Sequence, residues 1–213
     1  MIDLTTTYMG LELSSPLVAS PGPLTGDPSM WARLEAAGAG AIVLPSLFEE
    51  QIEHEAFAVD YALGHGTDSF AEALDYLPEL DGVRGGPERH LDLVAAAKEC
   101  LGIPVIASLN GVSSGGWVRY ARLLAAAGAD AIELNLYDTV TDPTATAHQV
   151  ERRYVDLIEE LKAEISVPLA VKIGPWFTAL AQTAVSFRIA GADGLVLFNR
   201  LYQPDIDLDT LEV

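Results

Sequence analysis

One lysine ends an otherwise apolar segment, where a cation could take part in chemistry. Alternation along residues 169–173 places Lys172 on the face opposite three branched aliphatic side chains, and Gly174 and Pro175 then end the strand. Helices would cover the apolar face, so Lys172 would point inward. Holding an ammonium there costs several kcal/mol unless an acceptor meets it, so Lys172 predicts a partner. The alternative is a lysine that extends from a strand end to solvent.

A glutamate on the preceding predicted strand could supply that partner. Alternation along residues 131–135 directs Glu133 and Asn135 inward, while Ile132 and Leu134 face the helices. A carboxylate should not stand alone in a core. We therefore expect Glu133 to pair with Lys172, directly or through one water.

A repeated pattern predicts the elements that position these residues. The sequence Ala-Ala-Gly-Ala-(Gly/Asp)-Ala precedes an apolar run at 36–44 and 126–134, and a related copy spans 190–198. Each copy indicates a helix end, a terminating glycine and a strand. Proline introduces two further strands, where no ladder donor is needed. The predicted strands cover residues 17–20, 41–45, 104–108, 131–135, 168–173 and 194–198.

Successive βα units fit an open doubly wound sheet or a barrel. The nucleotide fingerprint G-x-G-x-x-G is absent, and polar residues recur where strands end, which favours the barrel. These residues are Ser20, Ser46, Ser108, Asn110, Asn135, Lys172 and Asn199. We expect one α/β domain over residues 1–213, a TIM (β/α)8-type barrel of which about six βα units are present. A lid-like insertion would span about 47–90, and the domain would be truncated at its C-terminus.

Composition excludes several partners. Acidic residues outnumber basic ones 31 to 12, which gives a net charge of −19 and argues against nucleic acid or an anionic membrane. The single cysteine, Cys100, excludes an internal disulfide and indicates a reducing compartment. No stretch approaches the length of a membrane span. We expect a cytoplasmic protein without a metal, because no histidine has metal-ligand spacing.

Five motifs in order resemble the flavin-dependent dihydroorotate dehydrogenases. They are Ser-Pro-Leu-Val-Ala-Ser at 15–20, Ile-Pro-Val-Ile-Ala-Ser-Leu-Asn-Gly at 103–111, Glu133-Leu-Asn135, Val171-Lys172 and Phe198-Asn199. Residues 199–205 and 46–51 look more like the dihydroorotate dehydrogenase-like branch than the authentic pyrimidine enzymes. The resemblance covers the whole chain but only the front part of a family member.

The resemblance implies an FMN lying across the barrel mouth. Ala19, Ser20 and Ser46 would lie beside the ring, and Asn110 and Lys172 would reach its polar edge. A reduced flavin carries negative charge near N1, which a fixed cation stabilises. Lys172 is the natural candidate for that cation.

Two asparagines would face the substrate. The amides of Asn135 and Asn199 can donate to and accept from a planar, carbonyl-rich ring. The alternative for each is a role in capping or in a turn.

The sequence departs from the family pattern at the expected base. Pro45 stands where the family has a lysine, and residues 136–139 replace the serine and the cysteine base that follow the asparagine. Asp138 or Tyr137 could substitute, although an ordinary aspartate is a weak base. The resemblance therefore supports flavin binding better than dihydroorotate oxidation.

The leading hypothesis is an FMN-dependent oxidoreductase acting on CH–CH bonds. Hydride would pass between the flavin and a small cyclic or unsaturated substrate, with dihydroorotate/orotate of pyrimidine biosynthesis as one candidate pair. A Schiff-base aldolase or lyase using Lys172 is an alternative, and a catalytically silent barrel fragment is another. We expect a homo-oligomer with exposed sheet edges, and weak FMN binding if the phosphate-binding loops of later strands are missing.

Overall fold

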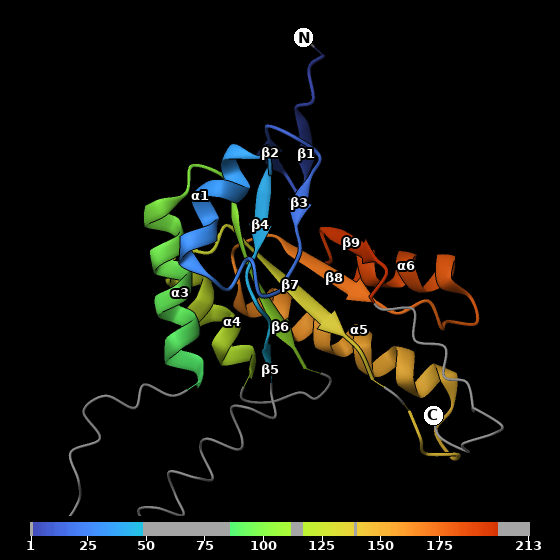
Figure 1. Cartoon of the computed structure of the whole chain (residues 1–213). Coiled ribbons are helices and arrows are strands. Elements are labelled where there is room, and N and C mark those ends of the chain that lie inside the picture. Colours follow the sequence, from blue (N-terminus) through green and yellow to red (C-terminus); the bar gives the residue numbers. More distant parts are fainter. Residues whose placement is uncertain (1, 49–85, 112–116, 139, 200–213) are drawn as a thin grey trace, which may run out of the picture.

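Seven strands form an open, curved sheet in the computed structural model, which describes residues 2–48, 86–111, 117–138 and 140–199 (Figure 1). Six of them are parallel neighbours in the order β3-β4-β6-β7-β8-β9, and the short β5 pairs with β6. The strands are β3 (Val18–Ala19), β4 (Ala41–Val43), β5 (Leu47–Phe48), β6 (Val105–Asn110), β7 (Ala131–Leu136), β8 (Leu169–Ile173) and β9 (Gly194–Leu197). All six predicted strands are confirmed, and the architecture is a partial (β/α) barrel.

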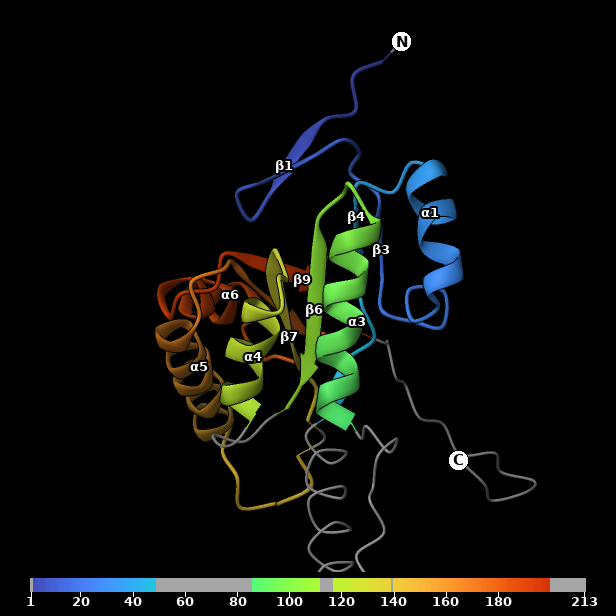
Figure 2. The same ribbon diagram turned by 90° about the vertical axis from the view of Figure 1, so that its left-hand side faces the viewer.

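Helices cover the outer face of this sheet (Figure 2). They are α1 (Pro28–Ala36), α3 (Gly86–Cys100), α4 (Trp117–Ala126), α5 (Ala147–Glu164) and α6 (Leu180–Ile189). Local sequence starts two of them: Asp27 caps α1 with a proline at the first turn, and Thr146 forms a capping box with Gln149 at α5. None of the helices that the structure describes has the length and apolar character needed to cross a bilayer.

An N-terminal hairpin, which the sequence did not predict, lies at the end of the sheet where the parallel strands begin (Figures 1 and 2). Its strands β1 (Thr6–Tyr8) and β2 (Leu11–Leu13) are joined by Met9 and Gly10, both with positive φ, as type I′ hairpin turns require. Its apolar side chains pack against inward residues near the starts of the parallel strands, namely Ala41, Val43, Ile106 and Ala131. The strands are too short for alternation to reveal them.

The two faces of the sheet differ along each strand. On β6, Val105, Ala107 and Leu109 point outward into the main core beneath the helices, whereas Ile106 packs against the hairpin cluster. The next two inward positions are Ser108 and Asn110. The inner face is therefore apolar near the hairpin and polar toward the carboxyl ends of the strands, as a barrel with a site at that end requires.

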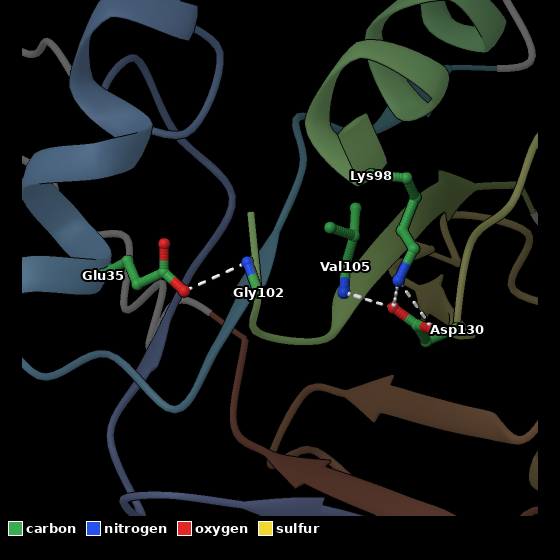
Figure 3. Close-up of polar contacts among 5 residues, drawn as sticks. All are labelled: Glu35, Lys98, Gly102, Val105 and Asp130. Atoms are coloured by element: carbon green, nitrogen blue, oxygen red, sulfur yellow. Dashed lines mark hydrogen bonds and ion pairs between the residues drawn. The ribbon is translucent and has the colours of Figure 1, made fainter. Parts of the chain in front are cut away.

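Two carboxylates connect the start of β6, and the turn just before it, to neighbouring elements at the amino end of the sheet. Asp130, just before β7, accepts the backbone N–H of Val105 at 2.7 Å and the ammonium of Lys98 on α3 at 2.8 and 2.9 Å (Figure 3). Beside it, Glu35 on α1 accepts the N–H of Gly102 at 3.0 Å (Figure 3). These bonds satisfy backbone N–H groups at the start of β6 and in the turn before it.

The third copy of the repeat contains the same arrangement. Asp193, before β9, accepts the N–H of Leu169 at 2.8 Å and pairs with Lys162 on α5. In both copies the aspartate N–H also donates to the carbonyl of the strand that its side chain holds, at 2.8 Å. The Gly/Asp position of the repeat is thus a clamp that fixes the register of two adjacent strands.

The first copy has Gly40 at this position, and the structure explains the exception. A Cβ on Gly40 would lie 2.1 Å from the carbonyl oxygen of Ser15, so no side chain fits. The Ser15 hydroxyl instead accepts the N–H of Leu17 at 3.1 Å, and Gly40 N–H donates to the Leu17 carbonyl at 2.7 Å. A serine from the segment before β3 replaces the clamp aspartate.

Removing a clamp carboxylate should destabilise the fold. Asp130→Ala leaves the N–H of the fully buried Val105 without an acceptor, so we expect a loss of about 1–3 kcal/mol in the free energy of unfolding, measured by urea denaturation. Asp156→Ala is the matched control, because it breaks only an exposed pair with Arg152 on α5 and should cost less than about 0.5 kcal/mol. Equal losses in the two variants would contradict the clamp.

Candidate functional site

The pairing of the central strands brings the inward polar residues into two adjacent rows. In the row at the carboxyl ends of the strands, Asn110, Asn135 and Lys172 are in register on β6, β7 and β8. In the next row toward the hairpin, Ser108 and Glu133 are in register. Parallel strands present these side chains to the same interior, so the strand ends gather one cation, one anion and two amides.

Lys172 and Glu133 form the expected pair. The ammonium lies 3.6 Å from Oε1 of Glu133, and the side chains are 18% and 6% exposed, respectively. At this distance Glu133 Oε1 is the buried side-chain oxygen that has no hydrogen-bond partner among the described residues. Burial raises the pKa of Glu133, and the nearby Lys172 charge lowers it by a smaller amount. The pair is therefore a long ionic contact between two largely buried side chains.

Tyr8 on the hairpin is part of the same interior, although the sequence analysis did not find it. Burial raises the pKa of Tyr8 to about 12, and the charge of Glu133 adds to the effect. Tyr8 thus remains a neutral phenol at physiological pH. It also lies against β9, because a Cβ on Gly194 would come within 3.2 Å of its ring. The hairpin is distant in sequence from Glu133, and no pattern links the two.

Two side-chain hydrogen bonds connect other predicted site residues. Asn199 Nδ2 donates to Asn135 Oδ1 at 2.8 Å, which joins the loop after β9 to the end of β7. The hydroxyls of Ser46 and Ser108 lie 2.8 Å apart, between the segment after β4 and β6. From the sequence, Ser108 is only one of several polar residues at strand ends. Its position beside Ser46 is decided by the sheet.

The remaining cofactor candidates lie on the first strands of the sheet. Ala19 is half-buried at the end of β3, Ser20 is exposed just after it, and Asn110 is half-buried at the end of β6. Pro45, which replaces the family lysine, packs close to Gly26, where a Cβ would be 2.9 Å from the proline ring. These residues lie on the same carboxyl edge as Lys172. Their roles remain predictions.

The two proposed bases lie in the loop after β7, beside a separate cavity. Asp138 pairs with Arg153 on α5 at 2.6 Å, and Tyr137 is 38% exposed. A cavity of about 530 Å³ opens between this loop, α5 and the loop after β8, with Tyr154 and Trp176 among its lining residues. The ion pair draws the Asp138 carboxylate toward α5. The role of Tyr137 or Asp138 as a base remains a prediction.

Parts of the sequence-based prediction fall on residues outside the described ranges. Most of the insertion at about 47–90 does so, with His54 and His65 inside it. Within the described part of the chain, no group of three His, Cys, Asp or Glu side chains is arranged to hold a metal ion.

The fold and its inward polar row define a partial (β/α) barrel, and solved structures share this fold. An IMP dehydrogenase/GMP reductase-like protein from Corynebacterium glutamicum aligns with a TM-score of 0.50 at 19% identity, over 91% of this chain and 48% of its own. A phosphonopyruvate hydrolase complex with oxalate and Mg²⁺ also aligns at 0.50, with 18% identity, over 90% and 61%. At such identities the likeness concerns the fold alone. No family model matches the chain.

Curated relatives connect the chain to one group of proteins. The catalytic subunit of dihydroorotate dehydrogenase B (NAD(+)) from Thermoplasma acidophilum is 26% identical over 98% of this chain, and that from Methanocella arvoryzae is 28% identical over 97%. The Endomicrobium trichonymphae subunit is 32% identical over 53%. The chain spans 66%, 65% and 37% of these three relatives. The chain is a distant homologue of the dihydroorotate dehydrogenases, as its motifs predict.

The Lys172–Glu133 contact should give a pH-dependent stability. Lys172→Met leaves Glu133 buried without its counter-ion, so we expect a loss of about 3–5 kcal/mol at pH 8 in urea denaturation. Burial raises the pKa of Glu133 in the folded protein, so the fold binds a proton there before the unfolded chain does. Stability of the variant should therefore be greater at low pH and fall as pH rises through the folded-state pKa.

The double variant Lys172→Met/Glu133→Gln is the control for this measurement. It contains no buried charge at the pair, so it should regain most of the lost stability at pH 8 and lose the pH dependence. A Lys172→Met protein as stable as the wild type at pH 8 would show that the contact has no energetic role.

Proposed function

We propose that the protein is an FMN-dependent oxidoreductase that transfers hydride between the flavin and a small cyclic or unsaturated substrate. The observation that carries the proposal is the position of Lys172, a partly buried ammonium in one row with Asn110 and Asn135 at the carboxyl ends of the strands. The distant homology to dihydroorotate dehydrogenases supports the same chemistry.

The described residues fit the polar edge of a flavin ring. The Lys172 side chain is 18% exposed, so it is mostly buried but can still be reached from the carboxyl edge of the sheet. Its contact with Glu133 is too long for a hydrogen bond, so the ammonium has donors to spare. In this proposal Asn110 and Lys172 hold the ring's polar edge, and Ala19, Ser20 and Ser46 line the ring.

When bound, FMN would supply a ring that accepts and returns hydride. The contribution of the protein is electrostatic and positional. Lys172 provides a fixed positive charge in an environment of reduced dielectric, where such a charge stabilises developing negative charge more strongly than in water. The amide of Asn110 can donate to or accept from a ring carbonyl or nitrogen. The hydroxyls of Ser46 and Ser108, joined to one another, keep the middle of the barrel polar.

The asparagine pair suits a planar substrate. The Asn199–Asn135 bond holds the two amides side by side, between the loop after β9 and the end of β7. Together they can orient a carbonyl-bearing ring above the carboxyl edge of the sheet. Tyr137 or Asp138 would move the substrate proton, with Arg153 determining the orientation of the Asp138 carboxylate.

A Schiff-base aldolase is a second candidate, because Lys172 is a partly buried amine at the same edge. Such an enzyme forms a covalent imine between the amine and a carbonyl substrate. Borohydride reduction in the presence of small aldehydes or ketones, followed by peptide mass spectrometry, separates the two candidates. An adduct at Lys172 would support the aldolase.

The flavin proposal is tested by titrating the purified chain with FMN. We expect quenching of flavin fluorescence in the wild type and a weaker affinity or slower flavin reduction in Lys172→Ala, since the variant lacks the charge at the polar edge. Arg188→Ala, an exposed change on α6, should match the wild type. Circular dichroism must show that both variants are folded. Binding and reduction unaffected by Lys172→Ala would remove this residue from the site.

Self-association is part of the same proposal. The outermost described strands, β3 and β9, present edges flanked by exposed apolar side chains, with Leu17 at 64% and Leu197 at 53% exposure. Such edges favour pairing with another chain. Light scattering should therefore give a mass above 22.7 kDa, the mass of one chain.

A further inference from the structure

Glu133 occupies a position where the fold itself does not require a carboxylate. In the other two copies of the repeat, the equivalent residues are Val43 on β4 and Val196 on β9. Val43 is buried against the hairpin cluster, which shows that an aliphatic side chain satisfies this position. A buried carboxylate costs more free energy than a buried valine, because the charge loses its hydration. The carboxylate of Glu133 is therefore better explained by a role in function than by the needs of the fold.

The surroundings of Glu133 leave one of its oxygens unoccupied. Ser108 is in register with Glu133 on β6, but its hydroxyl lies 2.8 Å from that of Ser46. Ala170, in register on β8, offers no polar side chain. Among the residues that the structure describes, two titratable groups act on Glu133: Lys172 from the row above, at 3.6 Å, and Tyr8 from the hairpin below.

These two neighbours differ in what they can exchange. Tyr8 has a pKa of about 12, so it neither gains nor loses a proton in the physiological range. Lys172 is a cation that faces the rim with 18% of its side chain exposed. Glu133 is therefore the group of this cluster that can change its charge when the electrostatic environment of Lys172 changes.

Resting on the proposed function, we infer that Glu133 is a positioning residue that takes up a proton when negative charge develops beside Lys172. In the resting protein the carboxylate and the ammonium compensate one another. Negative charge on the bound ring competes for the ammonium, and the buried carboxylate then becomes neutral by accepting a proton from solvent through the rim. Lys172 is thereby free to pair fully with the new charge, and the interior never holds two uncompensated anions.

The electrons and protons of the coupled step can be counted. Reduction of the flavin to its anionic form consumes two electrons and one proton, and protonation of Glu133 consumes a second proton. The substrate supplies the electrons as hydride in the proposed reaction, and dithionite supplies them in a titration. Without an ionisable group at position 133, the same reduction consumes two electrons and one proton.

The first experiment uses the chain without flavin. Carbon-13 NMR of the glutamate carboxyls follows Glu133, whose signal is identified by its absence in Glu133→Gln. We expect it to titrate above the ordinary value of 4.5, and to move higher still in Lys172→Met or, should that variant not fold, in Lys172→Gln. Lys172→Arg retains the charge and should leave the titration close to that of the wild type. Titration at the ordinary value, insensitive to the charge at position 172, would overturn the inference.

The second experiment measures the midpoint potential of the FMN-loaded protein against pH. The relevant pH range lies between the pKa of Glu133 in the oxidised protein and its pKa in the reduced protein, and above the pKa of N1 of the reduced flavin. In that range the slope should correspond to two protons per two electrons in the wild type and in Tyr8→Phe, and to one proton in Glu133→Gln. A one-proton slope in the wild type, with FMN bound, overturns the role of Glu133 while the proposed function stands. Because weak FMN binding is expected, failure of FMN to bind even in large excess refutes the proposed function, and the flavin-free titration still decides whether the pKa of Glu133 depends on the charge of Lys172.

Discussion

The register of the parallel strands is the constraint on which the rest of this structure depends. A slip of one residue in β8 would move Lys172 from the interior to the apolar face beneath the helices. Asp130 and Asp193 prevent such a slip, because each joins the first N–H of one strand to the start of the next and anchors both to a helical lysine. The register fixed at the amino end of the sheet thus determines which side chains face the interior at its carboxyl end.

The interior divides into a structural half and a chemical half. Near the hairpin, aliphatic side chains fill the inner face, and Tyr8 closes this side with a phenol that does not ionise. Toward the carboxyl edge, small and polar residues leave Lys172 and Glu133 3.6 Å apart, and Oε1 of Glu133 has no hydrogen-bond partner among the described residues. Tight packing in the first half makes it possible to tolerate an incompletely satisfied charge pair in the second.

Homology and the geometry of the site are two separate sources of support for the proposed function. The curated relatives are dihydroorotate dehydrogenases at low identity, and the chain spans only part of their length. The loop after β7 departs from the family at the base, and the structure directs Asp138 toward Arg153. The motifs that resemble the family contain the inward lysine and the asparagines, which are the residues suited to hold a polar ring. The departures concern the substrate, so the flavin is the better-supported half of the proposal.

The sequence by itself determined the six main parallel strands, the helix ends and the inward direction of Lys172 and Glu133, because alternation and terminating glycines are local properties. It also predicted that this charge pair would form, since neither charge could remain alone in a core. Only the tertiary structure decided that Tyr8 lies beneath Glu133, that Ser46 meets Ser108, and that Asp138 turns to Arg153 on α5. The same holds for Gly40, whose missing side chain makes room for Ser15. These contacts join segments that are far apart in the sequence, and their partners are selected by the packing of the whole chain, which no local periodicity encodes.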